Sequence, residues 1–131
     1  MRDSSTEDPH RALIERYLAA YNSFDVAGMV ATVHANMTFE NLTGGEVTAS
    51  ASGSAEFREL AERAARLFSF RRQTIRSYSW DGEAATIDIH FDGILAADLG
   101  PTLRAGETLR LTGRSTFAFR DGLIARIVDA S

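Results

Sequence analysis

Residues 86–92, Thr-Ile-Asp-Ile-His-Phe-Asp, alternate between polar and apolar side chains, which is the pattern of a β-strand. In such a strand Asp88 and His90 share one face, with Cα atoms about 6–7 Å apart. A nearby carboxylate fixes the tautomer of an imidazole and favours its charged form. The segment therefore predicts general acid–base chemistry, with His90 as proton donor or acceptor and Asp88 as its support.

The face of the sheet that carries this polar row decides whether the row can form a site. A polar row on an antiparallel strand is commonly the solvated face of the sheet. Alternatively, the row lines a cavity under the helices, and the opposite row of Ile87, Ile89 and Phe91 lies outside. Because an exposed apolar row is costly, this alternative also predicts a homodimer in which a partner subunit covers the outer sheet face.

Two further polar side chains end rows that are otherwise apolar. Asp129 follows the row that runs through residues 123–127, so a carboxylate stands at the end of a buried strand face. The alternative for Asp129 is a strand end that has reached water. Asn41 ends the row that contains Phe39, and its alternative role is to begin a turn over residues 41–45.

The composition removes several kinds of chemistry and several partners. The 131 residues carry a formal net charge of −4, and all 14 basic residues are arginines. The absence of lysine and cysteine excludes amine and thiolate nucleophiles and disulfides. No basic surface is available for nucleic acid or an anionic membrane. Without a hydrophobic leader or a bilayer-length apolar run, the chain is expected to be soluble and cytoplasmic.

Signals for metals and cofactors are also missing. His10 and His34 have no ligand spacing to His90, so no metal site is expected. The sequence has no phosphate-binding glycine loop, dinucleotide fingerprint or Gly-x-Ser-x-Gly motif, so no cofactor is expected. The adjacent Arg71 and Arg72 are expected to lie on a solvated face.

Helical spacing appears in three parts of the chain. Apolar residues recur at this spacing over residues 9–22, 26–35 and 55–68. Asp8, followed by a proline, and Asp25 are the expected N-caps of the first two helices.

Strand-like alternation fills most of the remaining chain. It predicts strands over residues 37–42, 72–80, 83–95, 107–120 and 123–129. The small-residue stretch 43–54 is interpreted as a loop, which either covers the mouth of a pocket or is a disordered connector. Helices followed by an antiparallel meander predict one α+β domain over residues 1–131, with helices on one face of a curved sheet. Residues 1–7 are expected to form a flexible tail.

Three motifs, together with this order of elements, give the chain a family resemblance. They are ERYLAAYN at residues 15–22 with Asp25 after it, FEN at residues 39–41, and FAFRDGLI at residues 117–124. Over nearly its whole length the chain resembles the SnoaL-like branch of the nuclear transport factor two superfamily. The resemblance implies a cone-shaped, cystatin-like α+β fold with a deep pocket between the helices and the concave sheet. It also implies dimerisation through the outer sheet face.

Within this superfamily the chain is similar to ketosteroid isomerase in its first helix, where Tyr17 stands at the position of the oxyanion-binding tyrosine. The sequence departs from that enzyme at two other positions. Asn41 replaces the general-base aspartate, and Ser115 replaces the second oxyanion donor, a protonated aspartate. The resemblance therefore does not imply a steroid isomerase mechanism.

The chain also resembles limonene epoxide hydrolase at Asn41 and Asp129, which correspond to groups that activate water in that family. The family's Arg-x-Asp pair, which supplies the acid, is replaced here by Asp88 and His90, and its tyrosine by Phe39. SnoaL-type polyketide cyclases and scytalone-type dehydratases similarly use a histidine and an aspartate without a cofactor.

These observations predict a cofactor-independent acid–base enzyme for a small, largely apolar metabolite of polyketide or terpenoid type. The reaction is cyclisation, isomerisation, dehydration or epoxide opening. Asp129 would be the general base, oriented by Asn41. His90, supported by Asp88, would be the general acid or an oxyanion donor, and Tyr17 would be a second donor. The predicted pocket walls are Leu13, Val33, Phe39, Phe68, Leu111, Ser115, Phe117 and Ile127. The alternative is a non-catalytic ligand-binding or dimerisation module on the same fold.

Overall fold

A computed structural model describes residues 4–131 and follows the predicted order of helices and strands. The three helices are α1 (Ser4–Asn22), α2 (Val26–Val30) and α3 (Ser54–Ala65). The six strands are β1 (Val33–Thr43), β2 (Glu46–Ser52), β3 (Phe68–Asp81), β4 (Ala84–Leu95), β5 (Thr108–Arg120) and β6 (Leu123–Ala130).

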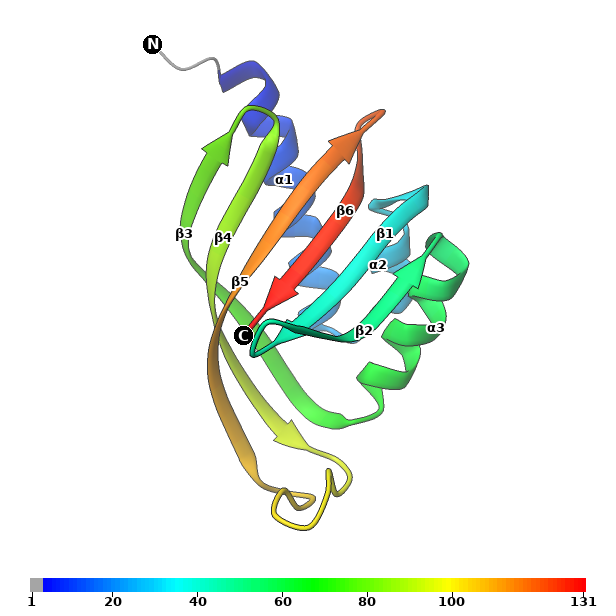
Figure 1. Ribbon diagram of the computed structural model, residues 1–131, viewed down its shortest axis with the longest axis vertical. Helices are drawn as coiled ribbons and strands as arrows, with labels where there is room; N and C mark the ends of the chain where they lie inside the picture. Colours follow the sequence, from blue (N-terminus) through cyan, green and yellow to red (C-terminus); the bar gives the residue numbers. More distant parts are fainter. Residues whose placement is uncertain (1–3) are drawn as a thin grey trace.

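The strands form one curved, unclosed sheet in the order β2-β1-β6-β5-β4-β3. β1 and β6 are parallel, and every other neighbouring pair is antiparallel. All three helices lie against the same face of this sheet, behind the strands in Figure 1. The predicted α+β architecture, with helices on one face of a curved sheet, is therefore confirmed.

The predicted loop over residues 43–54 is wrong, because most of it forms the edge strand β2. Gly44 and Gly45 have φ angles of +59° and +84°, which a tight two-residue hairpin turn requires and glycine adopts without strain. β2 pairs only with β1, and Ala51 is its single buried residue. An edge strand with one buried side chain has almost no hydrophobic alternation, which explains why the sequence pattern did not reveal it.

The helix boundaries differ from the predicted ones at three places. The third helix was predicted to reach residue 68, but α3 stops at Ala65 and Phe68 already begins β3. α1 begins at Ser4 and contains Pro9 within it, so Asp8 is not an N-cap. Asp25 is confirmed as the cap of α2, since its carboxylate accepts a hydrogen bond of 2.9 Å from the Gly28 amide. The predicted end of α2 is wrong, because the helix stops at Val30 and strand β1 already begins at Val33.

A polar cavity under the helices requires the row of β4 that contains Asp88 and His90 to face the helices. In the structure the other row of β4, which is apolar, faces them. Ile87 is fully buried, and Ile89 is only 8% exposed, both within the core under the helices. Asp88 lies on the outer face of the sheet, opposite Arg114 of β5. The polar row is therefore the solvated face. An apolar outer row, on which the expectation of a partner subunit rested, does not exist at this position.

The core fills the space between α1, α3 and the upper part of the sheet. Tyr17 of α1 lies between Phe57 of α3 and Phe117 of β5, with ring centroids 6.3 Å and 6.0 Å away. Met37 and Ile127, from the paired strands β1 and β6, are completely buried in the same cluster. This close packing fills the inner face of the sheet around Tyr17. A cavity lies beside the end of β6.

The assignment of faces on β4 predicts unequal effects of two neighbouring substitutions. Ile87→Ala removes a completely buried side chain, so the free energy of unfolding should fall by about 2–4 kcal/mol. Asp88→Asn changes an exposed side chain and should leave the urea midpoint close to that of the wild type. Equilibrium urea unfolding of both variants measures the difference. Equal losses would contradict the assignment.

Candidate active site

Asp129 lies near the end of β6, where it faces the interior between two neighbouring strands. Its register partners are Asn41 on β1 and Ser115 on β5, so these three residues form one cross-strand row. The Ser115 hydroxyl donates a 2.6 Å hydrogen bond to Asp129 Oδ1. Burial disfavours the charged carboxylate and raises the pKa of Asp129 to about 6, although the hydrogen bond from Ser115 acts in the opposite direction. The sequence prediction of an interior carboxylate is confirmed.

Asp129 is part of the wall of a cavity of about 440 Å³. The lining of the cavity includes the end of β6, at Ala130 and Ser131, and residues 111–115 of β5 beside it. Its polar wall residues are Tyr21, Asn41, Thr43, Gln73, Thr112, Arg114, Ser115, Asp129 and Ser131. Its main apolar wall residues are Phe68, Ile89, Phe91 and Leu111. The cavity thus combines the Asp129 carboxyl with an aromatic and aliphatic surface, and the Arg114 side chain lies at its edge.

The last turn of α1 is fixed to β3, and this attachment positions two cavity residues. The Asn22 side chain accepts a 2.8 Å hydrogen bond from the backbone amide of Gln73 and donates a 3.2 Å bond to its carbonyl. Tyr21 and Gln73 therefore stand next to each other at the cavity wall. Burial raises the pKa of Tyr21, while Arg71 and hydrogen bonding with Gln73 oppose this shift. Tyr21 thus keeps its proton and is a hydrogen-bond donor.

Tyr17, the predicted second donor, lies in the closed core and is not part of the cavity wall. Burial raises its pKa well above the ordinary value, and the nearby Asp129 carboxylate adds to this effect. Its hydroxyl therefore stays protonated. Tyr21 lies one helical turn after Tyr17, on the same helix face, and this spacing is typical of a core tyrosine, so Tyr21 was not predicted as a site residue.

Asn41 lies beside Asp129 as predicted, but its amide group is directed to other partners. Its Nδ2 atom donates to Thr48 Oγ1 at 2.8 Å and to Thr43 Oγ1 at 3.4 Å. The group that holds the Asp129 carboxyl is instead Ser115. Asn41 therefore contributes to the cavity wall and to the β1–β2 hairpin, while Ser115 orients the carboxyl.

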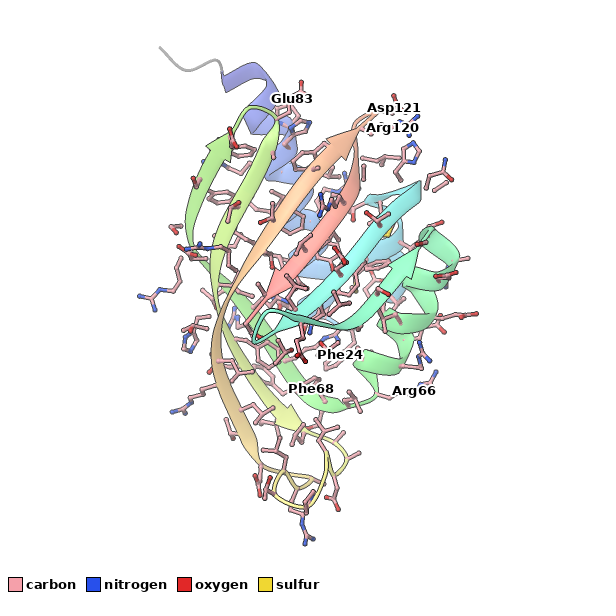
Figure 2. The ribbon with its side chains drawn as sticks, in the orientation of Figure 1. Phe24, Arg66, Phe68, Glu83, Arg120 and Asp121 are labelled. Atoms are coloured by element: carbon pink, nitrogen blue, oxygen red, sulfur yellow. The ribbon has the colours of Figure 1, made fainter. Side chains whose placement is uncertain are left out.

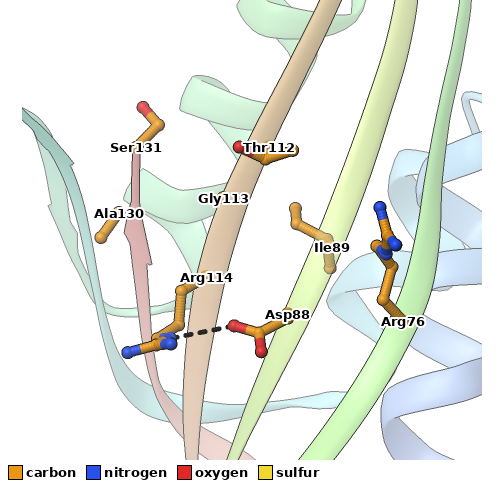
Figure 3. Close-up of a pocket in the computed structure, with 8 residues that line it drawn as sticks. All are labelled: Arg76, Asp88, Ile89, Thr112, Gly113, Arg114, Ala130 and Ser131. Carbon is orange, nitrogen blue, oxygen red and sulfur yellow. Dashed lines mark hydrogen bonds and ion pairs between the residues drawn. The ribbon is translucent and has the colours of Figure 1, made fainter.

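His90 and Asp88 lie on the opposite face of the sheet from Asp129, so they are not part of this site. Figure 3 shows Asp88 in an open depression, joined to Arg114 on the neighbouring strand. The Asp88 carboxylate accepts hydrogen bonds from Arg114 Nε at 3.0 Å and Ser77 Oγ at 2.9 Å, which lower its pKa. His90 faces Asp92 instead, at 3.5 Å from Nε2 to Oδ1. The prediction that His90 is the acid that acts with Asp129 is therefore wrong, because the two side chains lie on opposite faces of the sheet.

The predicted pocket walls are only partly correct. Phe68, Leu111 and Ser115 line the cavity. The other predicted residues belong to the closed core or pack against it, because α1 and α3 fill the space above them. These residues are Leu13, Val33, Phe39, Phe117 and Ile127.

Two side chains near the cavity were not predicted from the sequence. Gln73 gave no signal of its own, since a single polar residue in a strand is unremarkable. Arg71 was expected on a solvated face, yet it is only 2% exposed. Strand alternation places Arg71 in the same row as Gln73 and Ile75, two and four residues further along β3. The apolar Ile75 in this row was the one sequence feature that could have indicated that Arg71 faces the interior.

The described residues contain neither a candidate metal-binding group nor a candidate membrane-spanning helix. Among the side chains that the structure describes, no group of three or more histidines or carboxylates could hold a metal ion. Within residues 4–131, no helix combines the length and the apolar character that a membrane span needs.

Sequence comparison decides the family. Residues 14–127, which make up most of the chain, match the SnoaL-like domain. The chain belongs to the SnoaL-like domain family. The predicted resemblance to this branch of the nuclear transport factor two superfamily is thereby confirmed. No curated protein matches the chain in sequence.

Solved structures with the same fold have low sequence identity to this SnoaL-like domain. A cystatin-fold protein from Novosphingobium aromaticivorans has a TM-score of 0.72 and 17% identity, over 90% of this chain and 94% of its own. A proposed polyketide cyclase from Xanthomonas campestris pv. campestris has a TM-score of 0.72 and 23% identity, over 97% and 93% of the two chains. TerC, crystallised with polyporic acid, has a TM-score of 0.74 and 18% identity, over 92% and 89%. These similarities confirm the cystatin-like fold.

The raised pKa of Asp129 predicts a stability change with pH. The folded protein holds this proton up to a pKa of about 6, whereas an unfolded chain releases it near pH 4. Stability from this group is therefore complete below pH 4 and decreases as the pH rises through 6. Asp129→Asn removes this loss and should be more stable than the wild type at pH 7.5, by up to about 3 kcal/mol.

Urea unfolding at several pH values between 4 and 7.5 measures this difference. Asp81→Asn, at the exposed end of β3, is the matched control and should show no such gain. A gain for Asp129→Asn that is the same at pH 4 and pH 7.5 would exclude the titration of Asp129 as its cause.

Proposed function

We propose that this SnoaL-like domain is a cofactor-independent acid–base enzyme in which Asp129 is the general base. The observation that carries the proposal is a carboxyl with a pKa of about 6 at the wall of a cavity of about 440 Å³. A base is most effective when its pKa lies close to the working pH. At neutral pH most Asp129 side chains are ionised, yet they are more basic than an exposed aspartate.

The hydrogen bonds around Asp129 leave one carboxylate oxygen available to a substrate. Ser115 binds Oδ1, and the amide of Asn41 donates to threonines of the β1–β2 hairpin. This arrangement fixes the carboxyl plane while Oδ2 receives no hydrogen bond from the described residues. A base held in this way can remove a proton from a bound molecule without first losing a strong partner.

The proposed substrate is a small, largely apolar metabolite of polyketide or terpenoid type. The rings of Phe68 and Phe91 meet edge to face at the cavity wall, with centroids 5.4 Å apart, and Leu111 adds a half-exposed aliphatic surface. Such a wall favours flat, apolar ligands. The similar fold of TerC, crystallised with polyporic acid, and of a proposed polyketide cyclase supports the same class.

The position of His90 narrows the reactions that we propose. Epoxide opening and dehydration need an acid to protonate a leaving oxygen, and His90 faces away from the cavity. Removal of a proton from carbon next to a carbonyl needs a base and hydrogen-bond donors. Asp129 provides the base, and the protonated Tyr21 at the cavity wall provides a donor. We therefore favour isomerisation or cyclisation through carbon deprotonation.

Hydrogen–deuterium exchange tests this function without knowledge of the natural substrate. A panel of enolisable bicyclic ketones that includes 2-tetralone is incubated with the protein in D₂O, and NMR follows loss of the α-hydrogens. Asp129→Asn should lower the catalysed exchange rate by about 10²- to 10⁴-fold. His90→Ala, on the outer face, should leave the rate unchanged.

The pH dependence of the same reaction should report Asp129. Only the ionised carboxylate accepts a proton, so the exchange rate should rise about tenfold per pH unit below 6 and level off above it. Binding of these ketones without any exchange that depends on Asp129 would support the non-catalytic ligand-binding alternative instead.

A further inference from the structure

Arg71, on β3, is a buried cation directly behind the cavity wall. Its side chain is only 2% exposed. Its Nε atom donates a 2.8 Å hydrogen bond to the backbone carbonyl of Tyr21, at the end of α1. The guanidinium carbon lies 3.8 Å from the centre of the Tyr21 ring and 4.7 Å from the centre of the Phe24 ring. Arg71 is thus enclosed between aromatic rings beside a residue that lines the cavity.

The charge of Arg71 has no anionic partner among the described side chains. The ion pairs that these residues form join other groups and none includes Arg71. Its Nη2 atom is buried and has no acceptor. Buried charges are normally paired, because leaving water costs several kcal/mol per ion. Contact with the aromatic faces offsets part of this cost but does not neutralise the charge.

The surroundings of Arg71 direct this charge toward the cavity. Arg71 shares an inner row with Gln73, and its register partner on β4 is Gly93. A Cβ atom at Gly93 would lie 2.8 Å from the Phe91 ring and 2.9 Å from the Phe68 ring, so both rings need this glycine to pack here. Tyr21, Gln73 and these two phenylalanines are cavity walls. One layer of side chains therefore separates the guanidinium from a ligand.

The opposite side of Arg71 is closed by the turn between α1 and α2. Phe24 adopts a left-handed backbone conformation with a φ of 59°, which is unfavourable for a large side chain. This conformation places its ring against the guanidinium group. Figure 2 labels Phe24 and Phe68 on the same lower part of the molecule. Phe24 thus shields this part of the guanidinium group from solvent, while Tyr21, which also contacts the group, lines the cavity.

We propose that Tyr21 and Gln73, with Arg71 behind them, form a subsite for an anionic oxygen of the substrate. The Tyr21 hydroxyl and the Gln73 amide contact the oxygen, and Arg71 is a positioning residue that acts through Tyr21. The substrate class is a flat apolar molecule with a carboxylate, or with a carbonyl that becomes an enolate when Asp129 removes a proton. Both place a delocalised anionic oxygen opposite the base. This inference rests on one part of the proposed function, namely that the substrate binds in this cavity.

A purely structural role for Arg71 predicts a different result. An arginine at the end of α1 stabilises the helix through its last carbonyl groups and its dipole. Its loss would then lower the melting temperature but would not change the preference of the cavity for charge. Ligand selectivity, measured beside stability, separates these two roles.

The probes are 2-naphthoate and 2-naphthamide, which have nearly the same shape and differ in charge. Isothermal titration calorimetry at pH 8 uses Asp129→Asn as the background, so that neither repulsion by the base nor catalysis enters the result. We expect 2-naphthoate to bind about tenfold more tightly than 2-naphthamide, as one charge-assisted hydrogen bond would give.

Substitutions in this background test each part of the subsite. Arg71→Met should remove the preference for 2-naphthoate while 2-naphthamide binds as before, and Tyr21→Phe should reduce it several-fold. Arg71→Lys keeps the charge and should retain part of the preference. Arg72→Met is the matched control, since Arg72 is the next residue along β3 and is exposed. It should leave both affinities unchanged.

Three results would overturn the proposal. They are equal affinity for the two probes, no binding of 2-naphthoate at millimolar concentration, and an unchanged preference in folded Arg71→Met. If Arg71→Met does not fold, an unchanged preference in Tyr21→Phe overturns it. The comparison contains no catalytic step, so its failure would leave the role of Asp129 as base intact.

Discussion

The position of β6 between β1 and β5 is the constraint on which the candidate site depends. β6 is parallel to β1 and antiparallel to β5, and this pairing brings Asn41, Asp129 and Ser115 into one cross-strand row. β5 reaches β6 through a tight Asp-Gly turn, whereas β1 is separated from β6 by most of the chain. The serine that holds the carboxyl is thus supplied locally, while the amide beside it depends on the whole fold.

Two aspartates show how strongly the surroundings decide the chemistry of one residue type. Asp88 on the outer face accepts hydrogen bonds from an arginine and a serine, and its pKa is lowered. Asp129 on the inner face has one serine donor and little water, so its pKa rises to about 6. A buried ionisable group that lacks an ion-pair partner in the folded protein can bind a ligand group of complementary charge or exchange a proton with it. Arg71 has the same property with the opposite charge.

Sequence reasoning succeeded where a residue acts through its immediate neighbours. The Asp25 cap depends on contacts within a few positions and is present as predicted. Asp129 was found because a carboxylate ends an apolar row. Strand β2 was not predicted because an edge strand buries very few of its side chains. The burial of Arg71 was not predicted because the aromatic rings that enclose it come from α1 and from the turn after α1. Such distant contacts leave no periodic signal.

The sequence by itself determined the α+β class, the family, the two opposed rows of β4 and the order of the elements apart from β2. Alternation requires Asp88 and His90 to lie together, opposite Ile87 and Ile89. Alternation is symmetric, however, and cannot identify the row that faces the interior. Only the tertiary structure decided this, because the helices cover one face of the sheet and the apolar row gains most by burial there. The same packing left His90 in solvent and kept Asp129, with Tyr21 and Arg71, around the remaining cavity.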